Sequence, residues 1–191
     1  MKKIGITGGV GAGKSFVCQL IEEKGFPVFY SDVVAKEIMT TDKLLIQQII
    51  SNFGKQSYLE DKSLNKTYIA ELIFNDNTKR ELLNSLVHPA VYRAFEKWCQ
   101  QQTSEWVFLE SALMIDTGNH ELLDIVILVV ADHETRMERI AKRDDIGFEK
   151  IMERMNAQSD DTYKKQFADF VIDNSKGKDV KAQLDSVLEK I

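Results

Sequence analysis

The residues with the clearest chemical meaning lie near the amino terminus, in the segment ITGGVGAGKS. It contains the spacing Gly8-x-x-x-x-Gly13-Lys14-Ser15, which is the phosphate-binding P-loop pattern. In this pattern successive backbone N–H groups surround a phosphate, and the positive end of the following helix adds to the attraction. Glycine leaves room for this close approach and tolerates positive φ angles. The segment therefore predicts a nucleoside triphosphate site, in preference to a glycine-rich turn that only joins a strand to a helix.

The side chains of this loop have separate expected roles. Lys14 is expected to contact the β- and γ-phosphates, and the hydroxyl of Ser15 to hold Mg²⁺. The sequence contains no Asn-Lys-x-Asp segment, which would read guanine, so ATP is the expected nucleotide. The expected nucleotide contacts are Gly9, Val10, Gly11, Ala12, Gly13, Lys14, Ser15 and Phe16.

Carboxylates follow three of the expected strands. Asp32, in PVFYSD, is placed to accept the proton of an attacking hydroxyl or to position that hydroxyl; equally, it could cap the helix that begins VVAKEI. Glu110 and Asp132 are each candidates to assist Mg²⁺, or are ordinary polar residues at the start of a loop. Asp116, in the loop after Glu110, is a candidate substrate contact.

Three arginines share one face of an expected helix, because Arg136, Arg139 and Arg143 are spaced three and then four residues apart. Such a row can clamp a phosphoryl group during transfer, and we favour this function for at least one of the three over a merely solvated face. His88 precedes Pro89 at the expected start of a helix, where it would cap that helix or contact a ligand.

The elements that would position these residues follow from hydrophobic periodicity. Strands are expected around Ile4 and Ile6 and at residues 28–30, 106–109, 125–131 and 170–172. Helical stripes follow the glycine loop and close the chain at Val180, Leu184, Val187 and Ile191. Strands that alternate with helices predict an α/β fold of the P-loop NTPase type, with a parallel sheet of about five strands and helices on both faces.

Two segments are longer than the sheet requires. Between Asp32 and Trp106 lie 73 residues with helical stripes: Leu44, Leu45, Ile49 and Phe53, then Ile69, Leu72 and Ile73, then Val91, Phe95 and Trp98. We expect a helical cap at residues 32–105 and a helical lid at residues 132–166. The nucleotide-binding core would then comprise residues 1–31, 106–131 and 167–191 of a single kinase chain.

Composition narrows the class of protein. The formal net charge is −5, from 25 Lys and Arg against 30 Asp and Glu, which argues against nucleic acid as the main partner. The longest apolar run, residues 125–131, is far shorter than the roughly 20 residues that span a bilayer, so no membrane is expected. Cys18 and Cys99 lack metal-binding spacing and are expected to be free thiols in the cytoplasm. The oligomeric state stays open.

Six segments in order carry a resemblance to a known family: ITGGVGAGKS, GFPVFYSD, LVHP, VFLESALMIDTG, ETRMERIAKRDD with the later RMNAQ, and FADFVIDN. Together they resemble the dephospho-CoA kinase family, and the resemblance covers nearly the whole chain. It implies transfer of the γ-phosphoryl group of ATP to the ribose 3′-hydroxyl of dephospho-CoA. That reaction gives coenzyme A and ADP and is the last step of coenzyme A biosynthesis.

The resemblance also implies residue roles. Asp32 matches the family's catalytic aspartate, Thr7 a substrate-side residue beside the P-loop, and Arg139 and Arg143 the lid arginines. We therefore expect Asp32, Lys14 and Arg139 to be catalytic and Arg143 to contact the nucleotide. The cap would hold the acceptor, whose expected contacts are Thr7, Asp32, His88, Asp116 and Arg139.

Three positions depart from the family pattern. The family usually has Asp-Ala-Asp at residues 30–32 and Pro-Leu-Leu-Phe-Glu at residues 112–116, where this chain has YSD and ALMID. Arg136 stands where the family commonly has glutamine. These departures concern acceptor contacts and the role of Arg136 more than the reaction. The alternatives are a nucleoside or nucleotide kinase of similar architecture and a non-catalytic ATP-binding regulator.

Overall fold

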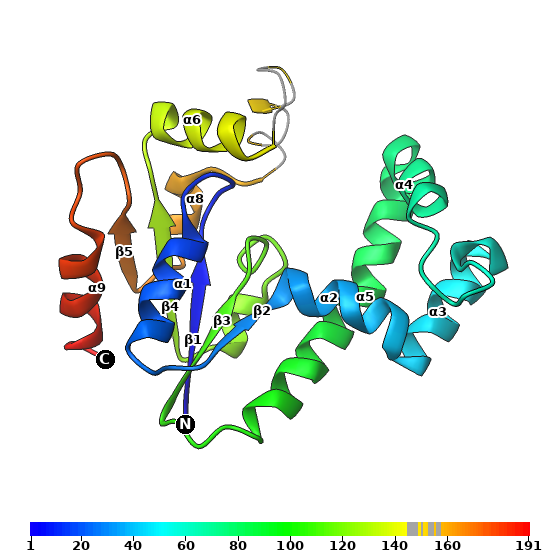
Figure 1. Cartoon of the computed structure of the whole chain (residues 1–191), viewed down its shortest axis with the longest axis horizontal. Coiled ribbons are helices and arrows are strands. Elements are labelled where there is room, and N and C mark those ends of the chain that lie inside the picture. Colours follow the sequence, from blue (N-terminus) through cyan, green and yellow to red (C-terminus); the bar gives the residue numbers. More distant parts are fainter. Residues whose placement is uncertain (145–148, 150, 153–154, 156–157) are drawn as a thin grey trace. The chain divides into compact units, whose positions relative to one another are not determined.

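The computed structural model describes residues 1–144, 149, 151–152, 155 and 158–191. Within these residues a single sheet has the strand order β2-β3-β1-β4-β5 (Figure 1). The strands are β1 (Lys2–Thr7), β2 (Val28–Tyr30), β3 (Trp106–Glu110), β4 (Ile125–Val130) and β5 (Phe170–Asp173). The predicted five-stranded parallel sheet is therefore confirmed, with each strand within a few residues of its expected bounds.

The centre of the sheet is apolar because β1 and β4 are covered on both faces. β1 pairs in parallel with β3 on one side and with β4 on the other, so that Ile6 lies opposite Glu110 and Ile127. Ile4, Ile6 and Ile127 have no exposed surface. Burying a branched side chain of this size stabilises a fold by about 1.5–3 kcal/mol. This burial fixes the position of β1, the strand that leads into the glycine loop.

The helix after the glycine loop has a well-defined end. α1 (Lys14–Glu23) stops at Gly25, whose φ of 86° requires the left-handed conformation that glycine favours. The N–H of Phe26 donates to the carbonyl of Ile21, and the N–H of Gly25 to that of Glu22. This pair of bonds is a Schellman motif and confirms the predicted stop.

Four further helices of the sheet-bearing part have bounds within the described residues. They are η2 (Asn119–Leu122), α6 (His133–Asp144), α8 (Asp161–Lys165) and α9 (Val180–Leu188). Val180, Leu184 and Val187 are the buried face of α9, as predicted, whereas Ile191 lies beyond the helix. The predicted lid, residues 132–166, and the RMNAQ segment, residues 154–158, each include residues outside the described set.

Helices dominate the segment between β2 and β3. They are α2 (Ser31–Thr41), α3 (Lys43–Phe53), η1 (Lys55–Ser57), α4 (Lys66–Asn75) and α5 (Asn77–Cys99). Asp42 caps α3 by accepting from the N–H groups of Leu44 and Leu45, and Asp76 caps α5 in the same way. In α3 the buried stripe is Leu45, Ile49 and Phe53; the prediction that Leu44 belongs to it is wrong, because this side chain turns outward and is 54% exposed.

The chain separates into two compact units. Unit 1 comprises Met1–Phe29 and Gln102–Ile191 and contains the glycine loop, and unit 2 comprises Tyr30–Gln101. Each unit has its own buried apolar residues: Ile127 and Leu128 belong to unit 1, and Phe95 to unit 2. The functional division into core, cap and lid stays a prediction.

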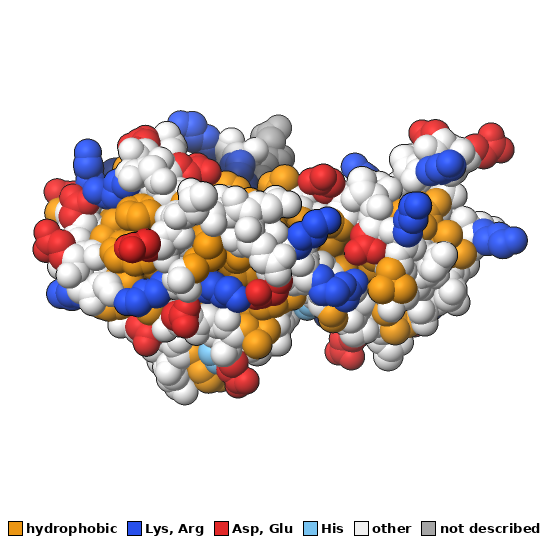
Figure 2. All heavy atoms as spheres, turned by 90° about the horizontal axis from the view of Figure 1, so that it is seen from below, with side chains coloured by type: hydrophobic (Ala, Val, Ile, Leu, Met, Phe, Trp, Pro, Cys, Tyr) orange, Lys and Arg blue, Asp and Glu red, His pale blue; other side chains and the backbone are white. Residues whose placement is uncertain are grey.

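Surface and thiol features complete the description. On the face of the molecule drawn in Figure 2, basic and acidic side chains are interspersed. Within the described residues, helices that combine enough length and apolar character to cross a membrane are absent. Cys18 and Cys99 are buried free thiols. Burial among apolar atoms, with the carboxylate of Glu110 adding to the effect, raises the pKa of the Cys18 thiol well above its ordinary value.

Candidate active site

The glycine loop joins the central strand to the first helix, as its pattern requires. β1 ends at Thr7 and α1 begins at Lys14, and Gly13 is the residue before the helix. Gly13 has φ 91° and ψ 32°, and the N–H groups of Phe16 and Val17 donate to its carbonyl. The predicted strand, loop and helix are therefore present, and the amino terminus of α1 directly follows the loop.

The side chain of Lys14 folds back onto the glycine loop. Its Nζ donates to the carbonyl of Gly8 at 3.0 Å and lies 3.8 Å from Oε1 of Glu110 at the end of β3. Both side chains are 11% exposed. Glu110 is thus a buried carboxylate that partners the P-loop lysine.

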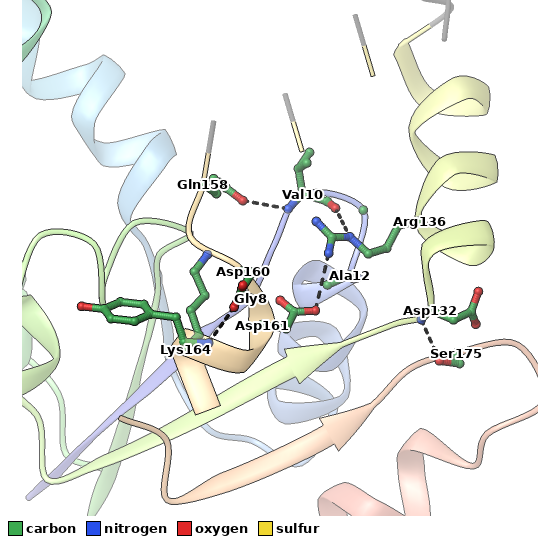
Figure 3. Close-up of polar contacts among 12 residues, drawn as sticks. Gly8, Val10, Ala12, Asp132, Arg136, Gln158, Asp160, Asp161, Lys164 and Ser175 are labelled. Atoms are coloured by element: carbon green, nitrogen blue, oxygen red, sulfur yellow. Dashed lines mark hydrogen bonds and ion pairs between the residues drawn. The ribbon is translucent and has the colours of Figure 1, made fainter. Parts of the chain in front are cut away.

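Arg136 reaches the glycine loop from α6. Its Nε donates to the carbonyl of Val10 at 2.9 Å, and its Nη1 lies 3.5 Å from Oδ2 of Asp161 on α8. On the other side of the loop, the N–H of Val10 donates to Oε1 of Gln158 at 3.0 Å. Figure 3 shows Gln158 and Arg136 approaching Val10 from opposite sides. Both polar groups of this residue are therefore held by side chains more than a hundred positions away.

Arg139 holds the next part of the loop. Its Nη1 donates to the carbonyls of Gly11 and Ala12 at 3.4 and 3.3 Å, and its Nη2 to the backbone carbonyl of Asn174 at 2.9 Å. The structure thus brings two of the three predicted arginines to the P-loop, where they bind its backbone. Arg143 lies in the last turn of α6.

Sequence reasoning did not single out Asn174 or Gln158. Asn174, directly after β5, is 5% exposed, and its Nδ2 donates to the carbonyl of Ala12 at 2.9 Å. Both residues belong to segments that carried the family resemblance, FADFVIDN and RMNAQ, but nothing local in those segments shows that they contact a loop at the opposite end of the chain.

The two carboxylates considered for Mg²⁺ have different surroundings. Asp132 accepts from the N–H and the hydroxyl of Thr135, at 2.8 and 2.7 Å, and so caps the start of α6. These hydrogen bonds lower the pKa of Asp132 below its ordinary value. Glu110 lies beside Lys14 instead. The hydroxyl of Ser15 is exposed in the first turn of α1. An exposed hydroxyl at this position fits Mg²⁺, which takes oxygen ligands and retains several water ligands.

Asp116 is bound by residues of its own unit. Its Oδ1 accepts from the N–H of Ser159 at 3.3 Å and also from the Ser159 hydroxyl. Its Oδ2 lies 3.6 Å from Nζ of Lys164, whose side chain has no exposed surface. This carboxylate joins the loop after β3 to the region of α8.

Thr7 has a buried hydroxyl with unused hydrogen-bonding capacity. The residue is 0% exposed, and its Oγ1 has no hydrogen-bond partner among the described residues. Leaving such a group unpaired costs about 1–3 kcal/mol. A hydroxyl of this kind, one residue before the glycine loop, is available to a bound molecule.

In unit 2 the structure corrects two predictions. Asp32 does not cap a helix, because α2 begins at Ser31 after Tyr30 and Asp32 lies inside its first turn. There its exposed carboxylate interacts favourably with the positive end of the helix dipole. His88 does not cap a helix either, because α5 runs through it and carries Pro89 in its interior. Asp76 already supplies the cap of α5.

His88 and Asp32 interact electrostatically within unit 2. Burial lowers the pKa of His88 below its ordinary value, and the negative charge of Asp32 opposes this shift in part. The imidazole of His88 is therefore harder to protonate than a free imidazole.

A parallel sheet whose central strand leads through a glycine loop and an inward-turned lysine into a helix defines a P-loop protein of the kinase type. Comparison with known proteins then gives the family. The sequence model described as dephospho-CoA kinase (CoaE) matches residues 2–179, and the chain belongs to this family.

Individual relatives agree with this assignment. The dephospho-CoA kinase of Salinibacter ruber is 38% identical over 177 residues, which cover 91% of this chain and 89% of the relative. A crystal structure of a Thermus thermophilus protein superposes with a TM-score of 0.85 at 27% identity and covers 100% of this chain and 97% of that one. The dephospho-CoA kinase of Campylobacter jejuni, at 24% identity and a TM-score of 0.72, covers 98% and 96% and shares the fold.

Proposed function

We propose that this protein transfers the γ-phosphoryl group of ATP to the ribose 3′-hydroxyl of dephospho-CoA, which gives coenzyme A and ADP. The observation that carries the proposal is an intact phosphate cradle in a chain that matches the dephospho-CoA kinase family over residues 2–179. The reaction completes coenzyme A biosynthesis. The two buried free thiols support a reducing compartment, and we place the reaction in the cytoplasm.

The donor side of the reaction belongs to unit 1. Residues 9–16 would surround the phosphates through their N–H groups, and Lys14 would exchange the carbonyl of Gly8 for the β- and γ-phosphate oxygens. Arg143 would contact the nucleotide from the last turn of α6. Ser15 would hold Mg²⁺, with Glu110 the better placed of the two candidate carboxylates because Asp132 is occupied as a helix cap. When bound, Mg²⁺ neutralises charge on the phosphate oxygens.

On the acceptor side we propose a role for each residue separately. Asp32 would accept the proton of the attacking 3′-hydroxyl, and His88, which interacts electrostatically with Asp32, would contact the acceptor. The unpaired hydroxyl of Thr7 would form a hydrogen bond to substrate. Arg139 would contribute positive charge at the cradle during transfer. For Asp116 we propose indirect support of the acceptor, because Ser159 and Lys164 already bind its carboxylate.

The proposed functions divide among three parts of the chain. We assign nucleotide binding to the core, residues 1–31, 106–131 and 167–191, acceptor binding to the helical cap, residues 32–105, and closure to the lid, residues 132–166. Exclusion of water by closure would protect ATP from hydrolysis.

A coupled assay of ADP release across acceptors tests the proposal. We expect turnover with dephospho-CoA and none with nucleoside monophosphates. Transfer to a nucleoside monophosphate but not to dephospho-CoA would establish a nucleotide kinase instead. Tight ATP binding without transfer to any acceptor would establish a non-catalytic regulator. Lys14→Ala is the control, since it should lose both nucleotide affinity and turnover in either kinase.

A further inference from the structure

The backbone of the glycine loop is held from outside by a set of side-chain donors. Three consecutive carbonyls, those of Val10, Gly11 and Ala12, accept hydrogen bonds from side chains. Arg136 donates to the first carbonyl, Arg139 to the second and third, and Asn174 to the third. A loop that binds anions through N–H groups thus has its carbonyls bound by three side chains that donate.

Peptide geometry connects these carbonyls to the phosphate. In a trans peptide the C=O of one residue and the N–H of the next lie in one plane and point in opposite directions. A donor that holds the carbonyl of Ala12 on the outer side therefore aims the N–H of Gly13 toward the inner side of the loop. The same relation links the carbonyl of Val10 to the N–H of Gly11. Fixing the carbonyls in advance removes a cost of ordering the N–H groups when the anion arrives.

Asn174 is the centre of this arrangement. Its backbone N–H donates to the carbonyl of Val130 at 2.7 Å, which fixes it to the end of β4. Its Nδ2 donates to Ala12, and its two oxygens accept from Nη2 of Arg139 at 2.9 and 3.3 Å. Asn174 therefore joins the sheet through its backbone N–H and the loop through its side-chain amide, and both its backbone and its side-chain oxygen orient the arginine that holds the neighbouring carbonyls.

The position of Asn174 also accounts for the glycine opposite it. A Cβ atom at Gly13 would lie 2.1 Å from Nδ2 of Asn174. Because Gly13 has no side chain, the amide can reach the carbonyl of Ala12.

We propose that Asn174 is a positioning residue for phosphoryl transfer: through the carbonyl of Ala12 and through Arg139, it sets the direction of the N–H groups that bind the ATP phosphates. The proposal rests on the proposed function, because it requires the loop to bind a nucleotide. Asparagine suits the role because its amide donates to the loop and its oxygen accepts from Arg139. Aspartate has the same shape and keeps the acceptor, but it cannot donate.

The test compares Asn174→Asp with Gln183→Leu as a matched control. Gln183, on α9, bonds to both the N–H and the carbonyl of Asp173, the residue next to Asn174. Both variants remove hydrogen bonds at the end of β5, but only Asn174→Asp removes the bond to the loop. Asn174→Ser, which keeps the backbone contacts of residue 174, carries the same test if the aspartate variant does not fold.

The readouts are the Kd of a non-hydrolysable ATP analogue by calorimetry and the KM for dephospho-CoA at saturating ATP. We expect Asn174→Ser, which removes the amide without adding charge, to weaken analogue binding about tenfold, and Asn174→Asp, which also adds a negative charge beside the loop, to weaken it at least as much. Both variants should leave the KM for dephospho-CoA unchanged. Gln183→Leu should bind the analogue as the unmodified protein does. Equal analogue affinity in all folded variants, or an equal loss in the control, would overturn the proposal. An unmodified protein that binds no analogue would refute the proposed function instead.

Discussion

A ribose hydroxyl holds its proton at neutral pH, so a carboxylate placed to accept that proton lowers the barrier to its attack on a phosphate. Asp32 is the proposed carboxylate, and Asp32→Asn keeps its shape while removing its basicity. We expect kcat to fall about 10²-fold or more, the usual range for loss of a general base, while ATP affinity stays the same. Steady-state kinetics and calorimetry measure the two quantities.

The control for Asp32→Asn is Glu60→Gln. Glu60 is exposed, and it belongs to the same unit, so this variant changes the charge of unit 2 equally. Its kcat should match that of the unmodified protein. Unchanged kcat in Asp32→Asn would leave Asp32 with only its favourable place in the first turn of α2.

The pKa of His88 provides an independent measurement of its electrostatic interaction with Asp32. Its pKa is lowered by burial and raised in part by Asp32. Removing the carboxylate in Asp32→Asn should therefore lower the pKa of His88 further, because less negative charge remains to favour the imidazolium. Titration of the imidazole signals by NMR measures this, with the signal of His133 on α6 as an internal reference. An unchanged or raised His88 pKa would contradict the coupling.

The lowered pKa of His88 also predicts how stability depends on pH. The folded protein binds this proton less readily than the unfolded chain does, so the contribution to stability is present above the unfolded pKa near 6.5. It is lost as the pH falls through the folded pKa. The glutamine in His88→Gln cannot titrate. The free energy of unfolding of this variant should therefore decrease less than that of the unmodified protein as the pH falls across that range.

At the scale of elements, the Asp116–Lys164 pair joins the loop after β3 to α8. Lys164 has no exposed side-chain surface, whereas Asp116 is 20% exposed and also bonds to Ser159. Asp116→Asn leaves a buried ammonium without its counter-charge and should cost about 3 kcal/mol of unfolding free energy. Lys164→Met leaves a carboxylate that still has Ser159 and water, and should cost about 1 kcal/mol.

Urea denaturation measures both costs, and the double variant should recover part of the larger one. A second possible outcome would assign Asp116 a different role. If Asp116→Asn retained full stability but raised the KM for dephospho-CoA, Asp116 would be a direct substrate contact rather than a support.

The elements themselves could largely be predicted from the sequence, because their signals are local. The strand Ile125–Val130 is a continuous apolar run, and the end of α1 follows from Gly25 and Pro27. α5 was harder: Pro89 suggested a helix start, but a proline in the interior of α5 removes one hydrogen-bond donor while the packing of Val87 and Ala90 on either side keeps the helix continuous.

The site could be predicted only where its residues are close in sequence. The loop from Gly8 to Ser15 carries its own pattern. The side chains that hold it are far away: Asn174 is 162 positions from Ala12, and Gln158 is 148 positions from Val10. Helical spacing placed Arg136 and Arg139 on one face, but it could not show that this face contacts backbone carbonyls. Such pairings depend on the register of β1, β4 and β5, which no short segment encodes.

At the scale of the whole molecule, the two compact units make the proposed division of labour measurable. The glycine loop and Arg136, Arg139 and Asn174, which hold it, belong to unit 1, whereas Asp32 and His88 belong to unit 2. Binding stabilises the regions that must be folded for the ligand to bind, by about 2.7 kcal/mol at a ligand concentration one hundred times Kd. Amide hydrogen exchange reports this stabilisation region by region.

We therefore expect different protection patterns from the two substrates. A non-hydrolysable ATP analogue should slow exchange most in the glycine loop, α1 and α6, by up to about a hundredfold at that concentration. Dephospho-CoA alone should slow exchange within residues 30–101, in α2 and α5 above all. Lys14→Ala should abolish the first pattern and keep the second, since it alters only the phosphate cradle. If dephospho-CoA protected the glycine loop and left residues 30–101 unchanged, the helical segment would not be the acceptor cap, and the acceptor contacts would have to be sought in unit 1.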